Sequence, residues 1–190
     1  MKRFKLTIKD IAEIAMLVSL AVLLDRDGLK IRLGAQSGSI SLTMVPLFVL
    51  ALRHGLIKSF IGIGIIYGLL TNLLDGYGFI TYPLDYLLAY GSLSLLSLFR
   101  PVLYRKYKHW IFNYLWLTLA IVSAVTIRLV FHVISGIVIY ETNFIGSLTY
   151  NASFVILPPL AVTLPVMWML WEPLKRINAR FPIQDQMSIL

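Results

Sequence analysis

Long apolar segments separated by short polar ones make up most of this chain. They are too long and too uniformly apolar around a helix for the surface of a soluble protein, and a bilayer-crossing helix needs roughly 20 such residues. We therefore predict an all-α integral membrane protein with six transmembrane helices in a single domain of 190 residues. The predicted helices cover about residues 8–24, 42–52, 56–74, 79–99, 110–140 and 147–171, and a polar tail covers 175–190.

The composition supports a membrane protein and excludes several kinds of catalytic and metal-binding chemistry. Hydrophobic residues make up 58% of the chain and charged residues only 14%, against about a quarter charged in an average soluble domain. The sequence has no cysteine, which excludes disulfides and thiolate chemistry. It also lacks a serine-centred nucleophile motif, a metal-spaced histidine pair and a phosphate-binding loop. We therefore expect neither an enzyme nor a bound metal or cofactor.

The basic residues are distributed unevenly between the two predicted sides of the membrane. Most of the 17 Lys and Arg residues fall on the side of the two termini, which the positive-inside rule assigns to the cytoplasm. The net charge of +8 is then explained by topology, so nucleic-acid binding is not expected. No small-residue cleavage site follows the basic residues 1–5, which predicts a retained first helix instead of a signal peptide.

One predicted helix carries polar groups at membrane depth. Four of its residues are spaced four apart, so on a helix they form one stripe that rotates slowly around the axis. They are Arg128, His132, Gly136 and Tyr140. Ionisable groups there are costly and usually face a bundle interior or a water-filled cavity. The stripe therefore predicts a wall of a small-molecule pocket. The alternative is a hydrogen-bonded core histidine with an arginine that anchors packing.

Polar residues of two other helices lie at a similar depth in the predicted topology. Asp85 lies toward the outer end of the fourth helix, and Asn151 lies near the outer start of the sixth. A few polar groups in an apolar wall are typical of a ligand pocket. An ionised Asp85 suits a cationic ligand, although it could instead form a salt bridge with Arg128. Residues 34–41 could cover the pocket as a lid or simply connect two helices.

Tyrosines near these polar groups could offer flat faces for stacking or for a cation. Each could equally belong to the core or to the membrane interface. These tyrosines are Tyr67, Tyr77, Tyr86 and Tyr140.

Several motifs, in this order and spacing, resemble one family of membrane proteins. They are QSGSISLTMVP at 36–46, ALRHG at 51–55, LDYLLAY at 84–90, RLVFHVISG at 128–136 and SLTYNASF at 147–154. Together they resemble the thiamine-specific S components of energy-coupling factor (ECF) transporters. The resemblance implies a six-helix protein that binds a vitamin near its extracellular face. It also implies as partners a transmembrane scaffold subunit and two cytosolic ATPases, and small residues on the first helix, Ala12, Ala15 and Ser19, as a scaffold-docking face. The alternative for these small residues is packing within the bundle.

The resemblance also implies roles for individual residues. Asp85 and Tyr86 would face the cationic thiazolium ring of thiamine, and His132 and Asn151 would hydrogen-bond the aminopyrimidine. Gly136 would allow close helix approach, and Tyr140 would fill an aromatic position. Gln36, Tyr67 and Tyr77 complete the predicted substrate contacts.

The chain departs from the family pattern between the last two predicted helices. The connection is shorter than usual, and Gly146 stands where an aromatic residue is common. None of the four tryptophans falls in the expected pocket, which predicts a thinner aromatic cage. An S component for another small vitamin or a pyrimidine precursor is therefore an alternative ligand assignment. A stand-alone secondary transporter, a membrane enzyme and a structural subunit are the alternatives of other classes.

Overall fold

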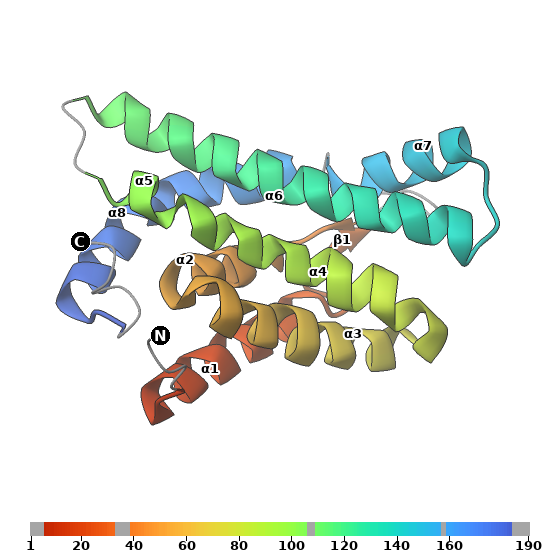
Figure 1. Ribbon diagram of the computed structural model, residues 1–190, viewed down its shortest axis with the longest axis horizontal. Coiled ribbons are helices and arrows are strands. Elements are labelled where there is room, and N and C mark those ends of the chain that lie inside the picture. Colours follow the sequence, from red (N-terminus) through yellow and green to blue (C-terminus); the bar gives the residue numbers. More distant parts are fainter. Residues whose placement is uncertain (1–5, 33–38, 106–108, 157–158, 184–190) are drawn as a thin grey trace.

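The computed structural model describes residues 6–32, 39–105, 109–156 and 159–183, and these residues are almost entirely helical (Figure 1). Its elements, with η for 3₁₀- or π-helical segments, are α1 (Ile8–Leu24), β1 (Ile31–Arg32), β2 (Ser39–Ile40), α2 (Met44–Phe60), η1 (Ile61–Tyr67), α3 (Gly68–Asp75), η2 (Phe79–Thr81), η3 (Tyr82–Leu88), α4 (Ala89–Gly91), η4 (Ser92–Phe99), α5 (Arg100–Leu103), α6 (Trp110–Val138), α7 (Phe144–Val155), η5 (Pro159–Thr163) and α8 (Leu164–Arg180).

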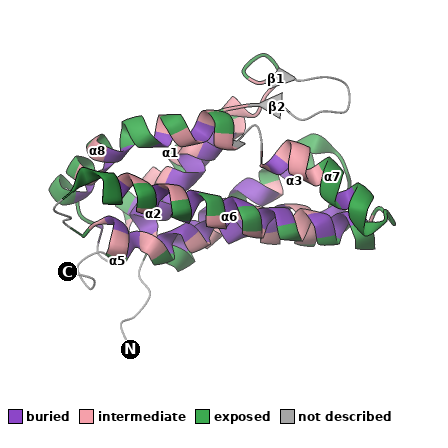
Figure 2. Cartoon of the chain, turned by 90° about the horizontal axis from the view of Figure 1, so that it is seen from above, coloured by how far each residue is buried: buried purple, intermediate pink, exposed green. Residues whose placement is uncertain are grey.

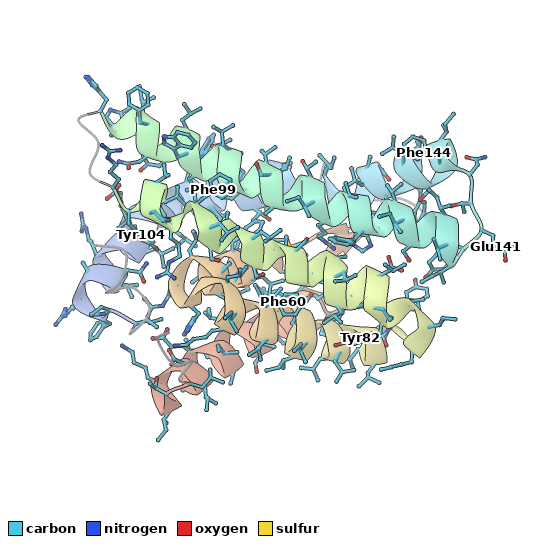
Figure 3. All side chains as sticks on the ribbon, viewed as in Figure 1. Phe60, Tyr82, Phe99, Tyr104, Glu141 and Phe144 are labelled. Carbon is cyan, nitrogen blue, oxygen red and sulfur yellow. The ribbon has the colours of Figure 1, made fainter. Side chains whose placement is uncertain are left out.

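The long helices run between two ends of the molecule. The start of α1, the end of α5 and the end of α8 lie at one end, whereas the α6–α7 connection lies at the other (Figure 1). Tyr104 and Glu141 mark these two ends among the side chains in Figure 3. The short strands β1 and β2 pair antiparallel, with Ile31 opposite Ile40.

Four helical stretches of the described residues are long and apolar enough to cross a membrane. They are Met44–Asp75, Phe79–Leu103, Trp110–Val138 and Phe144–Arg180. Buried and exposed positions alternate around the helices in Figure 2, and many exposed side chains are large and apolar. An apolar exterior is what a lipid environment requires. The membrane class and the helical fold are thus confirmed.

Gly55 breaks the first of these stretches. Its φ of 74° and ψ of 178° lie outside the helical region, in a part of conformational space that favours glycine. The break falls between the predicted helices 42–52 and 56–74. The chain on the two sides of Gly55 therefore forms two differently directed helical segments, although the hydrogen bonding of α2 continues to Phe60.

A glycine-lined contact between neighbouring helices positions Asp85. A Cβ added to Gly68 would lie 3.1 Å from the backbone oxygen of Tyr86, and one added to Gly64 would lie 3.0 Å from the Cα of Gly91. Only small residues allow helix backbones to approach so closely. The contact holds η3, the π-helical segment that carries Asp85, against η1 and α3.

A second close approach joins α6 to α7. A Cβ on Gly136 would lie 2.1 Å from Ser147 Oγ, so no larger residue fits there without movement. Glu141 adopts a φ of 52° in the intervening turn, and Thr142 donates from Oγ1 to the carbonyl oxygen of Gly136 at 2.7 Å. The expected close approach at Gly136 is therefore present, and it places Asn151 next to His132.

The C-terminal region differs from the expectation. Instead of one helix over 147–171 and a polar tail from 175, α7 ends at Val155 and α8 continues to Arg180. The added turns have a specific partner, because Asn178 Oδ1 accepts a hydrogen bond from Arg53 Nη1 at 2.6 Å and Asn178 Nδ2 donates to the Tyr104 hydroxyl. The end of the helix is thus held by tertiary contacts that local composition does not reveal.

Arg53 and Asn178 belong to a buried group that we term the ionic cluster. Its members come from α1, α2 and α8 and are Asp10, Glu13, Arg53, His54, Lys58 and Asn178. Arg53 Nη2 lies 2.7 Å from Glu13 Oε1, and Lys58 Nζ lies 3.0 Å from Asp10 Oδ2. These charges offset one another within the bundle and join α1 to the rest of the fold.

Candidate ligand-binding site

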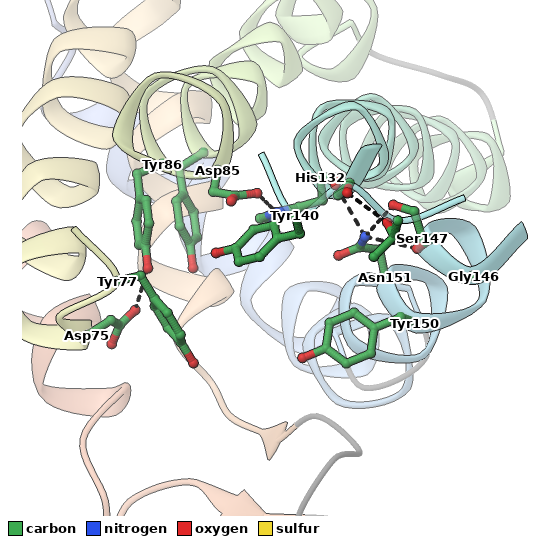
Figure 4. Close-up of a pocket in the computed structure, with 13 residues that line it drawn as sticks. Asp75, Tyr77, Asp85, Tyr86, His132, Tyr140, Gly146, Ser147, Tyr150 and Asn151 are labelled. Atoms are coloured by element: carbon green, nitrogen blue, oxygen red, sulfur yellow. Dashed lines mark hydrogen bonds and ion pairs between the residues drawn. The ribbon is translucent and has the colours of Figure 1, made fainter. Parts of the chain in front are cut away.

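A cavity of about 390 Å³ lies among the helices near the α6–α7 connection (Figure 4). It is lined by Asp75, Tyr77, Asp85, Tyr86, Tyr90, His132, Gly136, Tyr140, Thr142, Gly146, Ser147, Tyr150 and Asn151. Tyr86 and Ser147 are buried, whereas Tyr77, Tyr140 and Tyr150 are at least half exposed. The cavity therefore grades from a closed interior to an open mouth, and its volume suits a small molecule.

Two residues of the closed part of the cavity, Asp85 and His132, form a hydrogen-bonded triad with Ser135 behind the wall. Asp85 Oδ1 lies 2.9 Å from His132 Nδ1, and Asp85 Oδ2 accepts a hydrogen bond from the Ser135 hydroxyl at 2.6 Å. Ser135 is fully buried, and the side chains of Asp85 and His132 are each only 14% exposed. We term Asp85, His132, Ser135 and the neighbouring Asn151 the cavity cluster.

Asn151 uses its amide nitrogen within the protein. Nδ2 donates to the carbonyl oxygens of Ser147 at 2.9 Å and His132 at 3.2 Å. With the NH₂ group directed at these backbone oxygens, the side-chain oxygen is turned toward the cavity in Figure 4. Asn151 therefore presents a hydrogen-bond acceptor to a ligand.

Five tyrosines form the aromatic part of the wall: Tyr77, Tyr86, Tyr90, Tyr140 and Tyr150. The Tyr86 hydroxyl donates to Asp75 Oδ2 at 3.1 Å, which connects the closed part of the cavity to an acid at its mouth. Partial burial raises the pKa of the Tyr140 phenol, which stays protonated. The cage contains no tryptophan, but it has more aromatic rings than the sequence led us to expect.

Arg128 lies outside the cavity lining. Its guanidinium lies over the ring of Tyr90, 4.4 Å from the centroid, and Nη1 contacts Met44 Sδ at 3.7 Å. The alternative salt bridge with Asp85 is therefore replaced by the Asp85 contacts with His132 and Ser135. Among the described residues, no lysine or arginine lines the cavity. Two carboxylates and no basic group favour a cationic or neutral ligand over an anion.

The structure brings most of the predicted site residues together. Asp85, Tyr86, His132, Gly136, Tyr140, Asn151 and Tyr77 all line the cavity. Tyr67 is fully buried and packs edge-on against Tyr90, with 4.9 Å between ring centroids, so it supports the wall from behind. Gln36 lies outside the described residues, as does most of the proposed lid at 34–41.

The sequence reasoning missed several members of the site. Ser135 follows His132 by three residues, a spacing that shares a helix face, so the signal was present but overshadowed by the four-residue stripe. Asp75, which lies at the end of α3, is a second acid of the cavity wall that the sequence did not single out. Ser135 does not line the cavity itself but contacts Asp85, whereas Tyr90, Thr142, Ser147 and Tyr150 line the cavity. Ser147 and Tyr150 gave no signal of their own, because their placement depends on the Gly136 contact.

The fold and the cavity define the class: a helical membrane protein with a tyrosine-lined cavity, open at one side, whose volume suits a small molecule. A family model described as thiamine transporter protein (Thia_YuaJ) matches residues 11–178. The thiamine transporter ThiT of Bacillus subtilis (strain 168) is 31% identical, over 87% of this chain and 91% of that protein. A solved structure of ThiT from Listeria monocytogenes shares the fold, with a TM-score of 0.71 and 20% identity over 87% of this chain and 94% of that one.

The chain therefore belongs to the thiamine transporter family. Family membership confirms the resemblance found in the sequence and makes the protein a multi-pass membrane transporter and not an enzyme. 

Proposed function

We propose that this protein captures thiamine in the cavity and carries it across the membrane as the substrate-binding subunit of an ECF transporter. The family match over residues 11–178 is the observation that supports this most strongly. The cavity agrees with it, because acceptors, a carboxylate and aromatic faces suit a ligand with an amino group and a cationic ring.

The two ends of thiamine would meet different groups. The exocyclic amino group of the pyrimidine would donate to Asn151 and His132. The cationic thiazolium would lie near the charge of Asp85 and against tyrosine rings, among them Tyr86 and Tyr140. Gln36 remains a proposed contact from the loop that precedes β2.

The proposed topology has six spans with both termini in the cytoplasm, which opens the cavity to the outside. Ala12, Ala15 and Ser19 are exposed on α1, where they would dock a transmembrane scaffold driven by two ATPases. Small residues on an exposed helix face permit this kind of close helix contact.

Calorimetric titration of the purified protein without ATP tests the ligand. We expect one thiamine to bind per chain, and the isolated aminopyrimidine to bind more weakly because it lacks the cationic ring. Another small vitamin or a pyrimidine precursor binding in place of thiamine would reassign the substrate. Binding of none of these compounds would refute the proposal.

Uptake of radiolabelled thiamine into vesicles tests the mechanism. Vesicles that contain this chain alone should show no accumulation, whereas vesicles that also contain scaffold and ATPases should accumulate thiamine with internal ATP. Ala15→Trp should lower that uptake while leaving thiamine binding unchanged. Accumulation by the chain alone would instead identify a stand-alone secondary transporter.

A further inference from the structure

The carboxylate of Asp85 is held at both oxygens by donors from a single helix. His132 Nδ1 lies 2.9 Å from Oδ1, and the Ser135 hydroxyl lies 2.6 Å from Oδ2. An ionised carboxylate only accepts hydrogen bonds, so the proton in each contact belongs to the donor. Opposite an ionised Asp85, the proton of this contact is therefore on His132 Nδ1.

This assignment determines what the other nitrogen of His132 can do. In a neutral imidazole with Nδ1 protonated, Nε2 has a lone pair and accepts a hydrogen bond. Nε2 is buried and has no hydrogen-bond partner among the described residues, although His132 lines the cavity. A buried acceptor without a partner is costly, and a ligand N–H would satisfy it.

Ser135 departs from the usual behaviour of a hydroxyl residue in a helix. Ser123 and Thr126, also on α6, donate to the carbonyl oxygens of Leu119 and Val122, four residues earlier. Such local bonds are the ordinary way to satisfy a helical Ser or Thr. Ser135 instead reaches across to Asp85, which indicates that its hydroxyl has a role at the site.

We propose that Ser135 is a positioning residue that acts through Asp85. By occupying Oδ2, it fixes the carboxylate against His132, and the carboxylate keeps His132 in the Nδ1–H form with Nε2 free to accept an N–H of the ligand. The site is then selective for a ligand that donates at this point, such as an amino-substituted pyrimidine. This inference deepens the proposed function and rests on it for the identity of the ligand.

A double-mutant cycle on thiamine affinity tests the coupling. Ser135→Ala should weaken binding by about tenfold, the usual cost of one hydrogen bond to a charged group. In an Asp85→Ala background, the same change should alter affinity by less than about twofold, because its target is gone. Ser123→Ala is the matched control on the same helix and should bind as the unmodified protein does. Unchanged binding by Ser135→Ala, or additive effects of the two substitutions, would overturn the inference.

The tautomer of His132 gives a readout that does not depend on thiamine. In protein labelled with ¹⁵N-histidine, the signal lost in His132→Gln assigns this residue among the three histidines. We expect Nε2 to be unprotonated in the unmodified protein, and the other tautomer to gain population in Ser135→Ala. A protonated Nε2 in the unmodified protein would refute the inference. If thiamine fails to bind while the tautomer is as stated, the proposed ligand is wrong but the positioning role of Ser135 stands.

Discussion

The two polar clusters of this protein have similar side chains, but the histidine of the cavity cluster lines a cavity, whereas the histidine of the ionic cluster lies between two carboxylates. In the ionic cluster, Arg53 contacts both Glu13 and Asn178, and Lys58 contacts Asp10. His54 Nε2 lies 3.1 Å from Glu13 Oε2, and His54 Nδ1, which makes no hydrogen bond among the described residues, still lies 3.5 Å from Asp10 Oδ1. In the cavity cluster, Asp85 pairs with His132 Nδ1, and His132 Nε2 is buried beside the cavity with no hydrogen-bond partner in the part of the chain that the structure describes.

The surroundings of each cluster indicate whether it has a structural or a binding role more clearly than its residue types do. Both clusters contain a histidine next to a carboxylate, so composition alone would assign them the same role. Buried polar groups are normally satisfied within a protein, and an exception at a cavity marks a place for a ligand. We therefore expect the ionic cluster to stabilise the fold and the cavity cluster to contact the ligand.

The largest expected effect comes from breaking the ionic cluster. Arg53→Ala leaves Glu13 and Asn178 without their buried partner and should lower the free energy of unfolding by about 3–5 kcal/mol. Denaturant unfolding in detergent measures this loss. Arg176→Ala, at an exposed position of α8, is the control and should change stability by less than about 0.5 kcal/mol. Equal stability of the two variants would contradict the structural role of the cluster.

Neutralising Asp85 should lower thiamine affinity strongly and stability only slightly. Asp85→Asn keeps the shape and an acceptor oxygen but removes the charge, so thiamine affinity should fall on the order of a hundredfold, about 2.7 kcal/mol. The free energy of unfolding should change by less than about 1 kcal/mol, because Ser135 can still donate to the amide oxygen and His132 can adopt the tautomer whose Nδ1 accepts from the amide NH₂. Titration calorimetry and unfolding of the same preparation check both values. A stability loss as large as that of Arg53→Ala would erase the distinction between the clusters.

Gly136 is a place where fold and binding depend on the same contact. In Gly136→Ala the added methyl group would meet Ser147 Oγ, so α6 and α7 must separate at a cost of about 1–3 kcal/mol in stability. Thiamine affinity should fall with it, since Asn151 and His132 lie on the separated helices. The double variant Gly136→Ala with Ser147→Ala should recover part of both losses. No recovery would mean that the contact with Ser147 is not the cause.

The smallest expected change in thiamine affinity comes from substitutions of Tyr140, at the open mouth of the cavity. Tyr140→Phe keeps the aromatic face and should change thiamine affinity by less than about threefold. Tyr140→Ala removes the ring and should cost about tenfold, consistent with a cation–π contact of about 1 kcal/mol together with lost apolar contact. Side-by-side titrations check this ratio. Equal losses in both variants would assign the effect to the hydroxyl and not to the ring.

Much of the site could be predicted because polar residues are rare in apolar helices. Asp85, His132 and Asn151 stood out for that reason, and the cavity brings all three together. The contacts between them could not be predicted, since Ser135 competes with many ordinary helical serines. Only the helix packing shows that its hydroxyl meets Asp85 at 2.6 Å and that Arg128 turns toward Tyr90 instead.

The fold shows the same division between local pattern and tertiary contact. The apolar runs predicted a helical membrane protein, and the kink at Gly55 falls where a helix end was expected. The continuation of α8 to Arg180 was not predicted, because the residues after Trp171 look polar and solvated. Asn178 is buried there only because Arg53 and Tyr104 lie opposite it.

A structure of the protein soaked with thiamine tests the central claim most directly. We predict that thiamine lies in the cavity, with its amino group within hydrogen-bond distance of His132 Nε2 and Asn151 Oδ1. Thiamine bound elsewhere on the protein, with this cavity holding only water, would contradict the account.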